Sequence, residues 1–140
     1  EAVSNCVKSM SYVSNFHNVQ IRQKDIGEMT IPDNTDLLLS RDTLQHLSFN
    51  VIFKVLNNFA KFQTVKFYII GGYLEKGDNM DIKDGDYFSF NITKKPFGLI
   101  PNYIIKENNI GNEYPKYLFV FAVITTCFFR ISTSSVTKRI

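Results

Sequence analysis

The sequence predicts an all-β protein in which antiparallel strands form a sandwich or a barrel. Two observations support this prediction. Apolar and polar residues alternate in several short runs, and clusters of turn-forming residues separate those runs. The chain of 140 residues has the length of one domain, and no Pro/Ser-rich linker or block of like charge divides it. We therefore expect a single domain over residues 1–140.

The expected strands follow one another along the chain. Two short ones come first, marked by Val19 and Ile21 and by Ile26, Met29 and Ile31. Residues 35–47 fit a helical turn or two, or a strand. Three longer runs then alternate as half-buried strands do. Their expected inward residues are Leu47, Phe49, Val51, Phe53 and Val55, then Val65, Phe67 and Ile69, then Phe88, Phe90 and Ile92.

The inner face of these strands has an alternative. A register shift of one residue exchanges the two faces of a strand, which would make Ile52, Tyr68 and Ile70 the inner residues. Turn residues separate the runs at 32–34, 57–58, 76–79, 83–86 and 108–112.

Two further extended segments complete the sheet prediction. In segment 99–105, Pro101 has no backbone N–H, which predicts an edge strand. The run 117–129 is rich in aromatic and β-branched residues and indicates buried β-structure. It is shorter than the roughly 20 residues of a membrane-spanning helix. Because both of its faces are apolar, the choice of Phe119, Phe121 and Val123 as inward residues is arbitrary.

The two cysteines, Cys6 and Cys127, lie near opposite ends of the chain. A disulfide between them would tie the first strand to the last and would stabilise the fold by about 5 kcal/mol in the chain-entropy model. It would also place the protein in an oxidising compartment. The alternative is two buried free thiols in a reducing compartment. The polar surroundings of Cys6 favour the disulfide.

Composition narrows the expected location and partners. Apolar residues make up 44 % of the chain and charged residues 21 %, which argues against disorder over most of its length. The net charge of +3 comes from scattered lysines, too few for a nucleic-acid surface but compatible with transient contact with anionic lipid headgroups. The chain begins with Glu1, so we expect a removed secretory signal and a secreted protein. Asn91, in an N-x-[ST] sequon, is the expected glycosylation site.

Signals for catalysis or metal binding are weak. His17 and His46 have no other ligand at metal-binding spacing. The best metal candidate is the acidic cluster of Asp78, Asp81, Asp84 and Asp86. Its spacing lacks the alternating oxygen ligands and the distant Glu of a calcium loop, and solvated hairpin turns explain it. With no legible nucleophile, acid or base, we expect no metal, no other cofactor and no enzymatic activity.

The chain is rich in aromatic side chains, with 13 Phe and 7 Tyr. Rings are difficult to pack densely between two sheets, so this content is compatible with an internal cavity. A plain aromatic core, or a coding bias, explains the composition equally well and is favoured on composition alone.

Three features together resemble the lipid-recognition (ML) domain family. Cys6 stands a few residues in, and Cys127 stands in the last strand before FFRISTSSV. The phrase Lys83-Asp84-Gly85-Asp86-Tyr87 is similar to the K-x-G-x-Y that opens a strand of that family. A strand, a Pro-containing segment at 95–101 and a further strand from Tyr117 follow it. The chain departs from the family in lacking its additional disulfides and a turn between its last two strands.

The resemblance implies an immunoglobulin-like β-sandwich of about seven to eight antiparallel strands, closed by the Cys6–Cys127 disulfide and holding a lipid between its sheets. The chain would then be a secreted, non-enzymatic carrier of a lipid or another apolar small molecule. Lys94 and Lys95 would meet an anionic headgroup. The expected ligand-binding residues are Phe49, Val51, Phe53, Val65, Phe67, Ile69, Phe88, Phe90, Ile92, Phe119, Phe121 and Val123. The same residues would form the core if no cavity exists.

A second hypothesis is a protein–protein interaction or structural module with a filled core, acting on a protein receptor or another protein partner. It predicts an exposed apolar patch or an oligomer.

Overall fold

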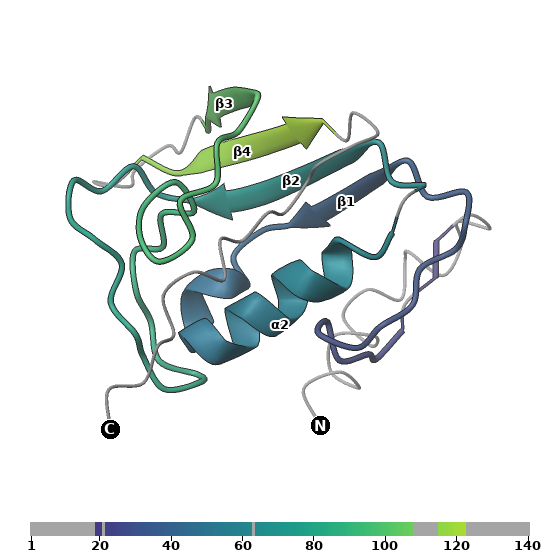
Figure 1. The fold of residues 1–140 in the computed structure, drawn as a ribbon, viewed down its shortest axis with the longest axis horizontal. Coiled ribbons are helices and arrows are strands. Elements are labelled where there is room, and N and C mark those ends of the chain that lie inside the picture. Colours follow the sequence, from purple (N-terminus) through teal and green to yellow (C-terminus); the bar gives the residue numbers. More distant parts are fainter. Residues whose placement is uncertain (1–18, 21, 63, 108–114, 123–140) are drawn as a thin grey trace, which may run out of the picture.

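A mixed four-stranded β-sheet with one α-helix against one of its faces forms the described part of the chain (Figure 1). The computed structural model describes residues 19–20, 22–62, 64–107 and 115–122. The elements, in chain order, are β1 (Leu37–Ser40), the 3-10 helix η2 (Leu44–His46), α2 (Phe49–Phe59), β2 (Phe67–Gly72), β3 (Tyr103–Lys106) and β4 (Tyr117–Ala122). The strands lie in the order β1-β2-β4-β3, with β1 parallel to β2 and the other neighbours antiparallel.

The predicted antiparallel, immunoglobulin-like sandwich of seven to eight strands is wrong. The described residues form one sheet, and two of its four strands are parallel. Parallel neighbours need a crossover connection, and here η2 and α2 provide it. None of the described residues between 19 and 31 belongs to a strand, and residues 26–28 form a turn.

Residues 49–55 of the segment predicted as the strand 47–55 form the start of α2, and their helical spacing is visible in the sequence. Ile52, Val55, Leu56 and Phe59 follow one another at intervals of three, one and three residues and are all buried. The competing alternation of Phe49, Val51 and Phe53 arises because the segment is apolar at most positions; these three side chains are only half-buried. No helix among the described residues is long and apolar enough to cross a membrane.

The acidic turn segment caps the beginning of this helix. The first backbone N–H groups of a helix have no partner within it. Here the N–H of Ser48 donates to Oδ1 of Asp84 at 2.7 Å, and the N–H of Phe49 donates to Oδ1 of Asp81 at 2.8 Å. The N–H of Gly85 donates to the carbonyl of His46 at 2.8 Å, which holds the same turn in place. Two of the four acidic residues therefore have a structural task at a helix terminus, where negative charge is favourable.

The other end of α2 is tied to the central strand of the sheet. The hydroxyl of Tyr68 in β2 lies 2.5 Å from the carbonyl oxygen of Phe59 and 3.1 Å from that of Phe62. Phe59 is the last residue of α2 and Phe62 lies in the turn that follows it, so the hydroxyl adds a second donor to carbonyls that already accept from the N–H groups of Phe62 and Val65. Burial raises the pKa of Tyr68, which keeps the phenol protonated as a donor.

Tyr68 also reveals that the predicted face of β2 is wrong. Phe67 and Ile69 were expected to point inward, but the buried residues of this strand are Tyr68, Ile70 and Gly72. Val65, which precedes the strand, is buried as expected. The alternative register is therefore correct for Tyr68 and Ile70 of β2. Ile52 is buried too, but on α2, where no strand register applies.

A long loop between β2 and β3 completes the core without forming a strand (Figure 1). Phe90 and Ile92 have no exposed surface, and the ring of Phe97 contacts the rings of Phe49, Phe53 and Phe90. A side-chain amide replaces the partner strand: Asn79 accepts from the N–H of Asn91 and donates to its carbonyl, both at 2.8 Å. The loop passes so close to β2 that a Cβ on Gly72 would lie 2.6 Å from the carbonyl oxygen of Phe90.

Removing either capping carboxylate should destabilise the protein. We expect Asp81→Ala and Asp84→Ala each to lower the free energy of unfolding by about 1 kcal/mol, the usual cost of losing a helix cap. Asp78→Ala is the matched control, because no hydrogen bond of its side chain is found among the described residues. Urea titration of the three variants measures the difference. An equal loss in Asp78→Ala would show that acidic charge in this turn, rather than capping, is responsible.

Candidate functional site

The face of the sheet opposite α2 is the candidate site, and it is apolar on all four strands. Side chains of a strand alternate between faces, so the inward residues of β2 place Phe67, Ile69 and Gly71 on this second face. The strand pairing extends the face across the sheet. Its rows are Leu37, Phe67 and Ala122; Leu39, Ile69, Val120 and Tyr103; and Gly71, Leu118 and Ile105. We call these ten residues the open face.

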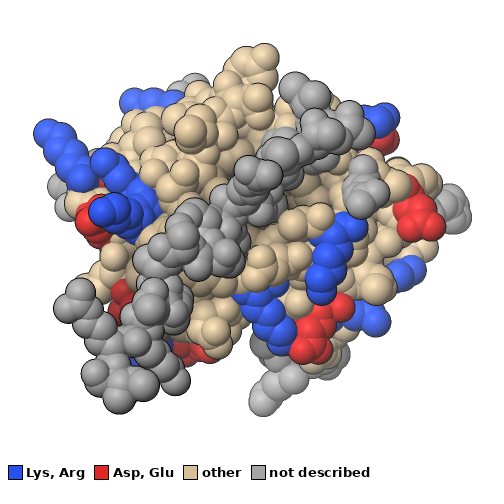
Figure 2. All heavy atoms as spheres, viewed as in Figure 1, with Lys and Arg blue, Asp and Glu red and all other residues tan. Residues whose placement is uncertain are grey.

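Much of the open face is accessible to solvent. Leu37, Leu39, Phe67, Tyr103 and Ile105 are between 42 % and 68 % exposed. A sheet with one solvated face usually alternates apolar and polar residues, so that its outer face is polar. Here the outer face is apolar, as is usual for the inner face of a sheet. In Figure 2 the upper centre of the molecule, over β3, is free of charged side chains, whereas Lys and Arg lie to either side of it.

Polar groups flank the open face at both ends of the strands. Before β1 and β2, Lys66 and Asp36 form an ion pair of 2.6 Å. At the opposite end, Arg41 follows β1, Glu107 follows β3 and Lys116 precedes β4. Arg41 binds both carboxylate oxygens of Glu107, at 2.9 and 3.1 Å. An apolar centre with a charged rim is the anatomy of many protein interfaces.

The charged cluster at the second end is a closed network. Asp42, in the left-handed region with a φ of 56°, accepts from Lys116 at 2.7 Å and from Arg41 at 2.9 Å. The hydrogen bond from Lys116 lowers the pKa of Asp42 below its ordinary value. The phenol of Tyr73 lies nearby, and burial raises its pKa. Because the charges in this cluster are paired with one another, we interpret it as a structural support rather than a catalytic centre.

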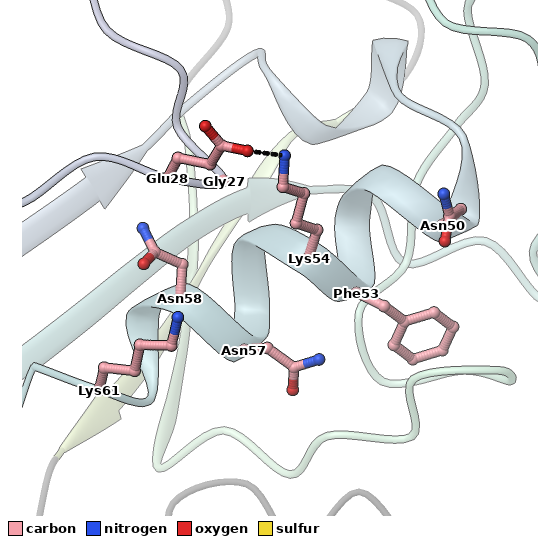
Figure 3. Close-up of a pocket in the computed structure, with 8 residues that line it drawn as sticks. All are labelled: Gly27, Glu28, Asn50, Phe53, Lys54, Asn57, Asn58 and Lys61. Atoms are coloured by element: carbon pink, nitrogen blue, oxygen red, sulfur yellow. Dashed lines mark hydrogen bonds and ion pairs between the residues drawn. The ribbon is translucent and has the colours of Figure 1, made fainter.

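A groove along the polar side of α2 is the second candidate, with a volume of about 510 Å³ (Figure 3). Its lining consists of Gly27, Glu28, Asn50, Phe53, Lys54, Asn57, Asn58 and Lys61. Lys54 points toward Glu28 and forms an ion pair of 2.6 Å with it. The amide of Asn58 donates to the carbonyls of Ile26 and Met29, at 3.1 and 3.0 Å. Lys54 and Asn58 thus hold segment 26–29 against the helix. Because these polar groups of the groove already have partners, we regard the groove as a weaker candidate site than the open face.

A smaller groove of about 390 Å³ lies where β2 ends and β4 begins, lined by Leu74, Glu75, Lys76, Gly77, Pro115 and Tyr117. It adjoins the charged cluster. Among the described residues, no group of three His, Cys, Asp or Glu is placed to hold a metal ion.

The structure divides the predicted ligand-binding residues among several places. Phe49, Val51 and Phe53 lie on α2, not on a strand. Phe67 and Ile69 belong to the open face, away from the core. Buried in the core are Val65, Phe90, Ile92, Phe119 and Phe121, with Phe88 half-buried beside them. Val123 lies outside the described residues. Because the other members are divided among α2, the open face and the core, they do not line one common cavity.

Other predicted sites meet the structure only in part. Cys6, Cys127 and His17 lie outside the described residues, so the disulfide stays a prediction. Asn91 is 2 % exposed, and its Nδ2, the atom to which a glycan would attach, donates to the carbonyl of Glu75 at 3.2 Å. Its glycosylation likewise stays a prediction. Lys94 and Lys95 lie in the loop after Ile92.

The sequence did contain the signal for the open face. In β2 every residue except the glycines is apolar or aromatic, and in β4 every residue is. A strand of that kind is expected to be covered on both faces. From the sequence, apolar residues on both faces were noted only for the run 117–129, and those of β2 were not placed on an exposed face.

Asp42 should contribute to stability in a pH-dependent way. Since its folded-state pKa is lowered, its contribution is present above the ordinary pKa of an aspartate, about 3.9, and is lost as the pH falls through the folded value. We expect Asp42→Asn to cost less than about 1 kcal/mol at neutral pH, because the pair is partly solvated, and to cost nothing at low pH.

Urea titrations of Asp42→Asn across this pH range measure the effect. Asp33→Asn serves as the control, since Asp33 is exposed and forms no ion pair within the described ranges. A difference for Asp42→Asn that persists at low pH would contradict an electrostatic origin.

Comparison of the chain with protein-family models, with curated proteins and with solved structures finds no significant match. The resemblance to the lipid-recognition family is therefore neither supported nor refuted by these comparisons, and the functional argument rests on the open face.

Proposed function

We propose that the chain is a protein-binding module whose open face packs against an apolar surface of a partner protein. The observation behind this proposal is the row of Leu39, Ile69, Val120 and Tyr103, which crosses all four strands without a charged side chain. The exposed members of this row are Leu39 and Tyr103, whereas Ile69 is half-buried and Val120 is only 8 % exposed. Exposed apolar side chains gathered on one face mark protein interaction sites on soluble proteins.

The energetic argument favours a partner with an extended surface. Burying apolar area contributes about 25 cal/mol per Å², so five half-exposed large side chains supply a substantial driving force when they are covered together. The aromatic members, Phe67 and Tyr103, are of the type enriched at the centres of interfaces. The ion pair of Lys66 and Asp36 and the Arg41 cluster would then form the polar rim.

A carrier of an enclosed lipid fits these observations less well. Phe90, Ile92 and Phe119 have no exposed surface, which indicates a filled core between α2 and the sheet. Both grooves are open to solvent and carry charged side chains in their lining. The predictions of secretion and of lipid binding remain open to direct measurement.

Charges placed on the open face should abolish binding without unfolding the protein. We expect Leu39→Lys combined with Phe67→Lys to reduce fluorescence of the dye ANS and to lose peptides that a phage-displayed library selects on the native chain. Asn50→Lys combined with Asn57→Lys adds the same charge on the exposed side of α2 and should change neither readout.

Two results would overturn the proposal. In the first, the native chain binds no ANS and selects no peptide whose binding requires Leu39 and Phe67. The open face would then already be covered. The other is a stoichiometric lipid in the organic extract of the natively purified protein, which would establish the carrier function instead.

A further inference from the structure

Strand β3 ends the sheet with one side unpaired among the described residues. It pairs with β4 only, and the order β1-β2-β4-β3 places it at the edge. All four of its residues, Tyr103 to Lys106, are exposed. An edge strand of this kind is a template for another strand.

The hydrogen-bond pattern shows which backbone groups are available. The N–H of Glu107 donates to the carbonyl of Lys116 at 2.9 Å, so this opposed pair is hydrogen-bonded. Bonded and non-bonded pairs alternate along antiparallel strands, so Tyr103 and Ile105 also bond toward β4. The N–H and C=O groups of Ile104 and Lys106 therefore point away from the sheet, toward the free edge.

The usable edge has a sharp beginning. The N–H of Asn102 donates at 2.8 Å to the carbonyl of Val120, which is the residue opposite Tyr103. Two successive residues thus face one partner, which is a β-bulge, and Pro101 precedes it. Regular pairing at the edge is confined to the few residues from Tyr103 onward.

We propose that β3 pairs with β3 of a second copy of this chain, antiparallel, with Ile105 opposite its own copy. In this register Ile104 of each strand faces Lys106 of the other, and their outward N–H and C=O groups form four hydrogen bonds by symmetry. Tyr103 faces Glu107. No like charges are opposed, whereas a shift by two residues in one direction would set Lys106 against Lys106.

A shift by two residues the other way centres the pair on Ile104 and brings the bulge at Asn102 opposite Lys106. Fewer hydrogen bonds then form. The two-fold pairing closes, because each copy uses its single β3 edge, so the assembly stops at a dimer. The proposal concerns the sheet edge, and it stands or falls separately from binding by the open face.

Sedimentation velocity over a dilution series of the full chain tests the pairing. The wild type should move from 16.2 kDa toward twice that mass as its concentration rises. Ile105→Lys alone and Ile105→Glu alone should each weaken association about tenfold or more, because like charges then face each other across the axis. An equimolar mixture of the two should dimerise again, since opposite charges now meet. The mixture therefore also shows that both variants are folded.

Two further variants separate this edge from the open face. Ile104→Pro removes one outward N–H and should give a monomer with an unchanged circular dichroism spectrum. Leu39→Lys lies on the opposite edge strand and should leave the dimer intact. Three results would overturn the β3 pairing. The wild type could stay monomeric, or the Lys/Glu mixture could associate no better than its components. The third is a dimer that is lost in Leu39→Lys but kept in the Ile105 variants. If the wild type is monomeric and β3 instead binds extended peptides, the partner of this edge is a strand of another protein.

Discussion

The contact between the hydroxyl of Tyr68 and the carbonyls of Phe59, the last residue of α2, and Phe62, in the turn after it, determines how the rest of the described structure is arranged. It joins the helix to the central strand, and it sets Tyr68 and Ile70 toward the helix. Because side chains alternate along a strand, Phe67 and Ile69 must then face the other way. The pairing of β2 with β1 and β4 transmits the same choice to Leu39 and Val120, and that of β4 with β3 transmits it to Tyr103. One buried phenol thereby fixes which apolar residues form the core and which remain at the surface.

This arrangement leaves the protein with one covered and one uncovered apolar face. The covered face is packed by α2 and by the loop that contains Phe90 and Ile92. Carboxylates from the acidic turn hold the helix terminus, and the network of Arg41, Asp42, Glu107 and Lys116 holds the ends of the strands. Two of the four acidic residues singled out from the sequence, Asp81 and Asp84, thus have a structural role. The open face is apolar, which is why we propose a binding role for it.

The sequence allowed part of this structure to be predicted. Segment 99–105, predicted as an edge strand because of Pro101, overlaps β3 at the edge of the described sheet, although β3 begins only at Tyr103. Phe90 and Ile92 are buried as expected but lie in a loop, and the burial of Phe119 and Phe121 agrees with a choice that the sequence left arbitrary. Segment 47–55 was wrong because it is apolar at most positions, so that periods of 2 and 3.6 both fit its apolar residues. The parallel pairing of β1 with β2 depends on contacts between residues distant in sequence, which local patterns do not contain. The capping role of Asp81 and Asp84 was likewise hidden, since the N–H groups they bind lie more than thirty residues away.

Hydroxyl-radical footprinting of the native chain, read residue by residue by mass spectrometry, tests the central claim most directly. The claim is that neighbouring residues of β2 face opposite environments. We expect Phe67, together with Leu39 and Tyr103, to be oxidised rapidly, and Tyr68 and Phe119 to be protected until the protein unfolds. Protection of Phe67 with rapid oxidation of Tyr68 would contradict the orientation of the sheet, and protection of both would contradict an open apolar face.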